Sequence, residues 1–169
     1  MRRDTLIDFF RDLVEIRGDF LVYDDGYRRR VHTYAEAGRA SRGFAARLAA
    51  AGLGKGDKVV FWGENRPEWV VCYWGCLLAG IVVVPIDYRS SADFVVKVCR
   101  LVEARVLMVG DDVDSIPGGG DTDGAVPWPF AELDWHADGP VPPVPISRDD
   151  LVQIIFTSGA TAEPKGVVM

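Results

Sequence analysis

A stretch that could bind a polyphosphate lies near the end of the sequence, between Thr157 and Gly166. An apolar run, residues 151–156, predicts a short buried strand, and hydroxyl-bearing and small residues, a proline and one lysine follow it at once. Small residues let backbone N–H groups approach phosphate oxygens, Thr and Ser hydroxyls add donors, and a lysine supplies positive charge. The sequence therefore predicts a phosphate-binding loop directly after a strand.

This loop differs from the Walker pattern G-x-x-x-x-G-K-[ST]. The residues between Gly159 and Lys165 do not end in the glycine of that pattern, and Gly166 stands where its Ser or Thr would hold magnesium. The simpler interpretation is a strand followed by a polar turn with a solvated lysine. The order of hydroxyl and small residues favours a phosphate loop of another kind.

The loop resembles the signature loop of the AMP-forming acyl-CoA synthetase family of adenylating enzymes, which usually reads Thr-Ser-Gly-Thr-Thr-Gly-x-Pro-Lys-Gly. The positions that match are Thr157, Ser158, Gly159, Thr161, Pro164, Lys165 and Gly166. Two positions depart. Ala160 removes a hydroxyl, and Ala162 removes a glycine and its freedom at positive φ. Because both alanines are small, we expect the cradle to stay open.

Two upstream stretches, residues 63–69 and 78–86, resemble the first sheet elements of the same family. The first is most similar to the long-chain fatty-acid branch, and the resemblance runs from about residue 20 to the end. It implies two half-reactions. A carboxylate, here a fatty acid, attacks the α-phosphate of ATP to give an acyl-adenylate, and a thiol, coenzyme A, then takes the acyl group. ATP, Mg²⁺ and coenzyme A are the implied co-substrates.

The resemblance also implies roles for the loop. Thr157, Ser158, Gly159 and Thr161 would hold the β- and γ-phosphates through hydroxyls and backbone N–H groups. Lys165 would supply charge to the same oxygens, and Gly166 belongs to the same phosphate-binding set. Glu163 is expected to be solvated, because a carboxylate beside a polyphosphate is repelled unless a metal lies between them. No metal ligand is assigned.

The family's adenine, ribose and magnesium contacts, and the small carboxy-terminal domain with its catalytic lysine, would follow this loop. Residues 167–169 begin a further apolar element, which predicts that the sequence is an amino-terminal fragment lacking the rest of its own chain. We expect residues 1–169 to be one partial amino-terminal AMP-binding domain without a complete catalytic set, and inactive alone.

The elements that position the loop follow from hydrophobic periodicity and from capping and turn signals. Helices are predicted over residues 5–18, 33–52, 67–80 and 91–102, a small hairpin over 20–32, and strands over 57–62, 81–84 and 106–109. Residues 111–150 hold seven of the ten prolines and predict a Pro/Gly-rich loop, with 130–133 as an edge strand or short turn. Alternating strands and helices indicate an α/β fold with a mostly parallel sheet and crossover helices.

Composition excludes several classes of protein. A net charge of -6 argues against a nucleic-acid surface, and Arg28–Arg30 read as a solvated strand edge. The three cysteines predict buried thiols rather than disulfides, and no signal peptide is evident, so a cytoplasmic protein is expected. Residues 69–86 carry no charge and reach the lower length of a membrane span, but Gly80 and the β-branched run after it favour a helix followed by a strand. Peripheral membrane contact stays open.

Two further functions remain as alternatives. One is a phosphate- or nucleotide-binding module without catalysis. The other is an adenylating enzyme that loads a different acceptor, because such enzymes share the same loop.

Overall fold

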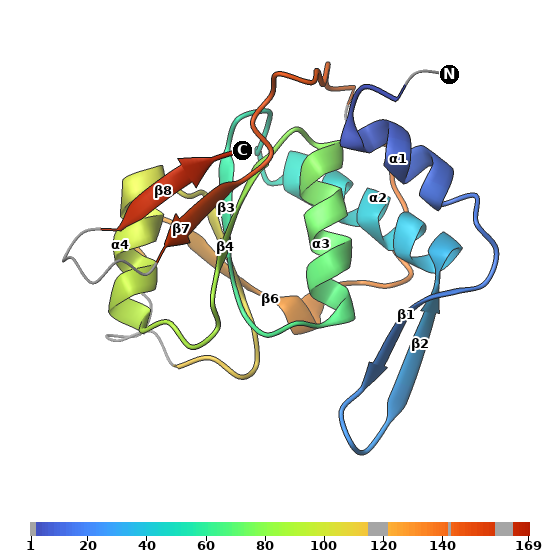
Figure 1. The fold of residues 1–169 in the computed structure, drawn as a ribbon, viewed down its shortest axis with the longest axis horizontal. Coiled ribbons are helices and arrows are strands. Elements are labelled where there is room, and N and C mark those ends of the chain that lie inside the picture. The colour runs from blue at the N-terminus through green and yellow to red at the C-terminus, as the bar shows by residue number, and fades with distance from the viewer. Residues whose placement is uncertain (1–2, 115–121, 142, 158–163) are drawn as a thin grey trace. The chain divides into compact units, whose positions relative to one another are not determined.

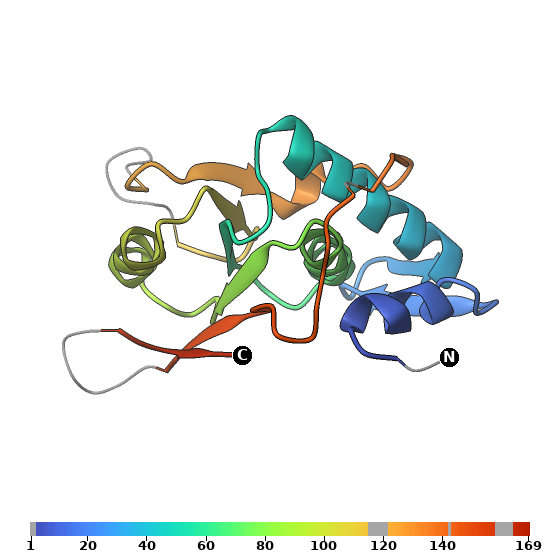
Figure 2. The ribbon, with the colours of Figure 1, turned by 90° about the horizontal axis from the view of Figure 1, so that it is seen from above.

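The computed structural model describes residues 3–114, 122–141, 143–157 and 164–169. The chain divides into two compact units (Figures 1 and 2). Unit 1 comprises Met1–Gly54, Asn65–Gly80 and Leu133–Asp150, and unit 2 comprises Lys55–Glu64, Ile81–Glu132 and Leu151–Met169. That residues 1–169 form a single partial domain stays a prediction.

Three helices build unit 1: α1 (Leu6–Leu13), α2 (Tyr34–Ala50) and α3 (Pro67–Leu78). Both predicted capping boxes are present. Thr5 and Asp8 cap α1, and Thr33 and Glu36 cap α2, where the Thr33 N–H donates to the Glu36 carboxylate at 2.8 Å. These bonds satisfy backbone donors that the first turn of a helix leaves free. The helix starts read from the sequence are confirmed, although α1 ends at Leu13, before Gly18.

Helices α2 and α3 pack closely because Gly75 has no side chain. A Cβ at Gly75 would lie 2.8 Å from Cδ1 of Phe44 and 2.9 Å from the Ser41 carbonyl oxygen. The inner stripe of α2, including Ala37, Phe44 and Leu48, is buried as the periodicity predicts.

The predicted hairpin is formed by β1 (Asp19–Asp24) and β2 (Arg29–Thr33), which pair antiparallel and project from the helices of this unit (Figure 1). At its turn the Asp25 carboxylate accepts from the N–H groups of Tyr27 and Arg28, which holds the pKa of Asp25 below its usual value. The segment after Leu133 lies against α2 and the hairpin. Arg42 donates to Asp138 at 3.0 Å, and the Trp135 ring stacks on His32 with centroids 3.6 Å apart.

A parallel sheet forms the centre of unit 2. Its strands, in spatial order, are β4 (Val82–Ile86), β3 (Lys58–Trp62), β5 (Val106–Val109) and β6 (Val126–Pro129). Helix α4 (Ala92–Val102), capped by Ser91, packs Val95, Val98 and Cys99 against one face of the sheet, on Val60, Trp62 and Val84. The α/β class and the mostly parallel sheet are confirmed.

Two strands contain prolines, although the sequence predicted that one would end before its proline and that the other would be part of a loop. Pro85 does not end β4, which runs to Ile86, and β6 contains Pro127 and Pro129 within the predicted loop. Both strands lie at edges of the four-stranded sheet. The Val126 N–H donates to the Arg105 carbonyl, toward the inside of the sheet. N–H positions alternate sides along a strand, so those of Pro127 and Pro129 face outward, where a missing N–H removes no hydrogen bond of the sheet. Residues 130–132 form a 3₁₀ turn, in agreement with the turn alternative.

No helix in the described part of the chain is long and apolar enough to cross a membrane. Helix α3 stops at Leu78, Gly80 turns the chain with φ of 69°, and β4 begins at Val82. Cys72, Cys76 and Cys99 are buried free thiols, and burial raises the pKa of Cys99 to about 12. The helix–turn–strand interpretation of residues 69–86 is confirmed.

Candidate functional site

The predicted phosphate loop is closed by a hairpin of unit 2, formed by β7 (Ile154–Thr157) and β8 (Lys165–Val168). The two strands pair antiparallel, with Phe156 opposite Gly166 and Thr157 opposite Lys165. The backbone of Thr157, the first residue of the predicted phosphate set, therefore lies beside Lys165, near the end of that set. Ser158, Gly159 and Thr161 lie outside the described residues, and so do Ala160, Ala162 and Glu163.

Strand β7 has a packed face and an outward face. Ile154 and Phe156 pack against the core that α4 and the sheet share, whereas Ile155 and all four residues of β8 are exposed. Side chains alternate across a strand, so Lys165 belongs to the face that points away from the core. The Lys165 side chain is therefore accessible to solvent. The run 151–156 was predicted as a buried strand, but Leu151 is exposed and only alternate residues from Ile154 onward pack inward.

Backbone hydrogen bonds join this hairpin to the sheet. The Val83 N–H of β4 donates to the Val152 carbonyl at 3.0 Å, and Gln153 bridges Val83 in parallel orientation. Gln153 and Met169 exchange two bonds, the Met169 N–H donating at 2.9 Å and the Gln153 N–H at 3.3 Å. The base of the loop is thus continuous with β4.

A second polar feature of unit 2 lies where the carboxyl ends of β3 and β5 meet. Strand β4, which follows β3 in the chain, lies on one side of β3, and β5, which follows α4, lies on the other. The strand order therefore reverses between β3 and β5, and such switch points are common ligand sites in α/β sheets. Here the Glu64 carboxylate accepts from the N–H groups of Asp111 and Asp112, at 3.4 and 3.3 Å. A Cβ on Gly110 would lie 2.7 Å from the Gly63 Cα, so two glycines bring these strand ends together. The Glu64 carboxylate therefore already binds the N–H groups of Asp111 and Asp112 at this switch point.

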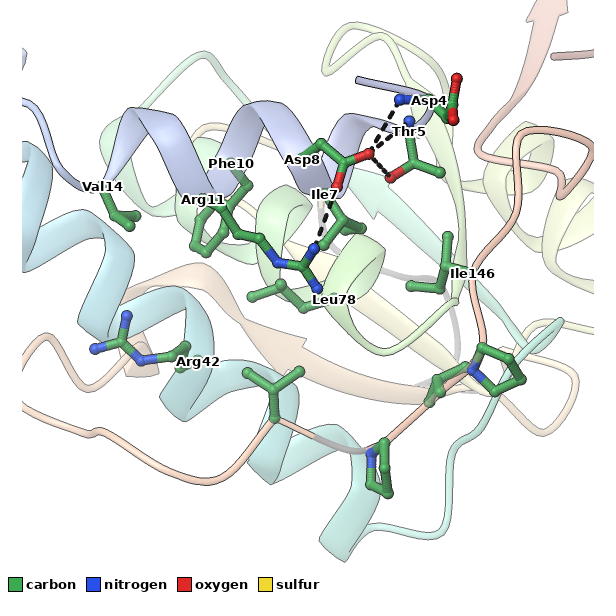
Figure 3. A pocket seen from close by; sticks show the side chains of 14 residues that line it. Asp4, Thr5, Ile7, Asp8, Phe10, Arg11, Val14, Arg42, Leu78 and Ile146 are labelled. Carbon is green, nitrogen blue, oxygen red and sulfur yellow. Dashed lines mark hydrogen bonds and ion pairs between the residues drawn. The ribbon is translucent and has the colours of Figure 1, made fainter. Parts of the chain in front are cut away.

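Unit 1 contains a cavity of about 740 Å³ between α1 and the segment after residue 140 (Figure 3). Ile7, Phe10 and Leu78 supply apolar lining. The charged side chains at its edge are already paired. Arg11 donates to Asp8, whose pKa is lowered chiefly by the Thr5 N–H, and Arg42 binds Asp138, whose pKa it lowers. Among the predicted phosphate-binding residues that the structure describes, Thr157, Lys165 and Gly166, none lines this cavity.

In the part of the chain that the structure describes, no group of three or more His, Cys, Asp or Glu side chains could hold a metal ion together.

Comparisons with known proteins agree on one family. The sequence pattern described as "AMP-binding enzyme" matches residues 11–169. A feruloyl-CoA synthase of Amycolatopsis sp is 31% identical over 149 residues, which cover 81% of this chain and 28% of that protein. The fatty acid–[acyl-carrier-protein] ligase ScoC of Streptomyces coeruleorubidus is 32% identical over 148 residues, 83% of this chain and 28% of that protein.

A solved structure shares the fold as well as the sequence. The amino-terminal subdomain of Klebsiella oxytoca NpsA, in complex with 3-hydroxyanthranilyl-AMSN, superposes with a TM-score of 0.77 at 29% identity. The superposition covers 99% of this chain and 41% of that one. The chain thus spans less than a third of the length of both curated relatives described above.

Proposed function

Because the chain belongs to the AMP-binding enzyme family, we propose that residues 157–166 bind the β- and γ-phosphates of ATP in an adenylate-forming ligase. The observation that carries this proposal is the β7–β8 hairpin, which puts Lys165 on the exposed face opposite Thr157 at the ends of the loop. Hydroxyls and backbone N–H groups of Thr157, Ser158, Gly159 and Thr161 would complete the cradle.

The loop would act by positioning and by neutralising charge. When a carboxylate attacks the α-phosphate of ATP, the bond to pyrophosphate breaks and negative charge grows on the departing oxygens. A fixed ammonium group and oriented donors stabilise that charge more than they stabilise bound ATP, and this difference lowers the barrier. Lys165 would therefore contribute more to the rate of adenylate formation than to ATP affinity.

The acid is proposed to be a long-chain fatty acid and the acceptor coenzyme A. Residues 63–69 resemble the long-chain branch, and one relative is named for a fatty acid and another for a CoA product. The relatives' names differ in both acid and acceptor, so the test compares a panel of acids with CoA and a carrier protein as acceptors. Thioester formation by the whole ligase should be fastest with a long-chain acid and CoA. A preference for an aromatic acid or a carrier protein would overturn this assignment.

The phosphate role can be tested by binding. We expect Lys165→Ala to weaken ATP and pyrophosphate binding to the purified chain about tenfold, as measured by isothermal titration calorimetry, since one charge-assisted bond contributes about 1.5 kcal/mol or more. Lys97→Ala is the matched control, because Lys97 is exposed on α4 of the same unit and carries the same charge. Equal losses in the two variants would show a general charge effect and contradict the proposed site.

A further inference from the structure

Gly166 lies directly opposite Phe156 in the β7–β8 pair. A Cβ added to Gly166 would come within 3.1 Å of Cζ and 3.2 Å of Cε1 of the Phe156 ring, and within 3.0 Å of Cγ2 of Ile154. These separations are tighter than ordinary side-chain contacts. The Phe156 ring therefore occupies the space in which a side chain at position 166 would stand.

The backbone at Gly166 does not itself require glycine. The glycines of this chain with positive φ include Gly80 and Gly124, and Gly166 is not one of them. Gly166 is instead part of an extended, paired strand, a conformation that any L-residue adopts. What excludes a larger residue on this side is the packing of Ile154 and Phe156, which are both held against the core of α4 and the sheet.

We propose that Phe156 and Gly166 form a positioning pair for the phosphate loop, with Gly166 acting through Phe156 and not by contact with the phosphates. The proposal rests on the proposed role of Lys165. The ring of Phe156 lies against Gly166, an exposed residue of β8, and this contact holds β8 in the register that sets Lys165 opposite Thr157. A slip of one residue would turn Lys165 to the side of Ile154 and Phe156.

This role differs from the one that the loop sequence implies for Gly166, where it belongs to the phosphate-binding set. If a glycine were needed for close approach of its backbone to a phosphate, the identity of residue 156 would not affect the cost of replacing it. If the glycine is needed to seat the ring, a smaller residue at position 156 should relieve that cost. The two roles therefore predict opposite results for a double variant.

The experiment compares Gly166→Ala, Phe156→Leu and the double variant in the full chain. Leucine removes the two ring atoms that the new Cβ would meet. We expect Gly166→Ala to weaken ATP binding between about twofold and 150-fold, the range that coupling between contacting residues gives. The double variant should bind more tightly than Gly166→Ala alone, with incomplete recovery because Ile154 Cγ2 remains. Val167→Ala, on the exposed face of the same strand, is the matched control and should bind as the wild type does.

A second measurement separates this inference from the proposed function. Amide hydrogen exchange of β7 and β8 reports the pairing without ATP, so it remains informative if the wild type binds no ATP at all. Protection should fall in Gly166→Ala and recover in the double variant. The positioning role would be overturned if the double variant lost as much exchange protection as the two single variants together. It would also be overturned if the losses in ATP binding were additive while the strand pairing stayed intact, and Gly166 would then be assigned to direct phosphate contact.

Discussion

Glu68 is an acidic residue within the folded body of unit 1. Its side chain is 7% exposed and accepts at 2.9 Å from Arg66, whose side chain is 9% exposed, while Arg30 lies 4.0 Å away. Glu68 also lies in the first turn of α3, where the helix dipole favours negative charge. Removing one member of a buried pair leaves the other charge desolvated.

We therefore predict that Glu68→Ala lowers the free energy of unfolding by about 3 kcal/mol, the low end for a broken buried pair because Arg30 is exposed and adaptable. Urea denaturation measures the change. Glu68→Gln should lose less, because its amide oxygen still accepts from Arg66. Asp87→Ala removes a comparable pair with Arg89 at the surface and should change stability little. Similar losses for Glu68→Ala and Asp87→Ala would contradict the burial argument.

At the scale of elements, close packing of helices depends on Gly75. Alanine there gains up to about 1 kcal/mol of helix propensity, but its Cβ would meet the Ser41 carbonyl of α2, which is backbone and cannot rotate away. Overpacking costs about 1–3 kcal/mol, so after the propensity gain is subtracted we expect Gly75→Ala to lower the free energy of unfolding by up to about 2 kcal/mol. The control is Gly54→Ala, where an added Cβ meets nothing within 4 Å. A thermal melt showing Gly75→Ala as stable as Gly54→Ala would refute this packing.

The stack of His32 on Trp135 joins β2 to the segment after Leu133 and should be sensitive to pH. Burial lowers the pKa of His32 below 6.5, an effect that Glu36 and Glu68 oppose and Arg30 reinforces. The Nε2 atom is buried without a hydrogen-bond partner among the described residues, which also favours the neutral ring. The unfolded chain then binds the proton more readily than the folded chain does.

Stability from the neutral ring is present above pH 6.5 and is lost as pH falls through the lower pKa of the folded state. We predict that His32→Phe, which keeps a stacked ring, flattens the stability curve between pH 7.5 and about 5. Asp138, a carboxylate whose pKa is lowered chiefly by Arg42, acts at lower pH and should be unaffected. Chemical denaturation at several pH values gives the comparison. Parallel curves for the two proteins would exclude this role of His32.

At the scale of the whole molecule, the chain corresponds to a minor part of its relatives. It covers 28% of the feruloyl-CoA synthase and 41% of the NpsA subdomain. We predict that the purified 169 residues form no acyl-adenylate with fatty or aromatic acids, because phosphate binding alone positions neither acid nor adenine. ATP–pyrophosphate exchange measures this. Exchange above background that Lys165→Ala abolishes would show that the chain is catalytic by itself.

Local structure and family membership could both be read from short stretches of this sequence. Capping pairs at Thr5 and Thr33, the β-branched run after Gly80 and the loop from Thr157 to Gly166 each carry their signal within a few neighbouring residues. Such signals predict where helices begin, where strands run and what a loop binds. The α/β class followed from their order along the chain.

Only the tertiary structure decided which residues meet. Pro127 and Pro129 argue against a strand until β6 is known to be an edge, and only the strand pairing places Phe156 opposite Gly166. The physical reason is that local periodicity reports which face of an element is apolar. Periodicity does not show which strands pair, because pairing depends on which sheet edge is left open by segments that are distant in the sequence.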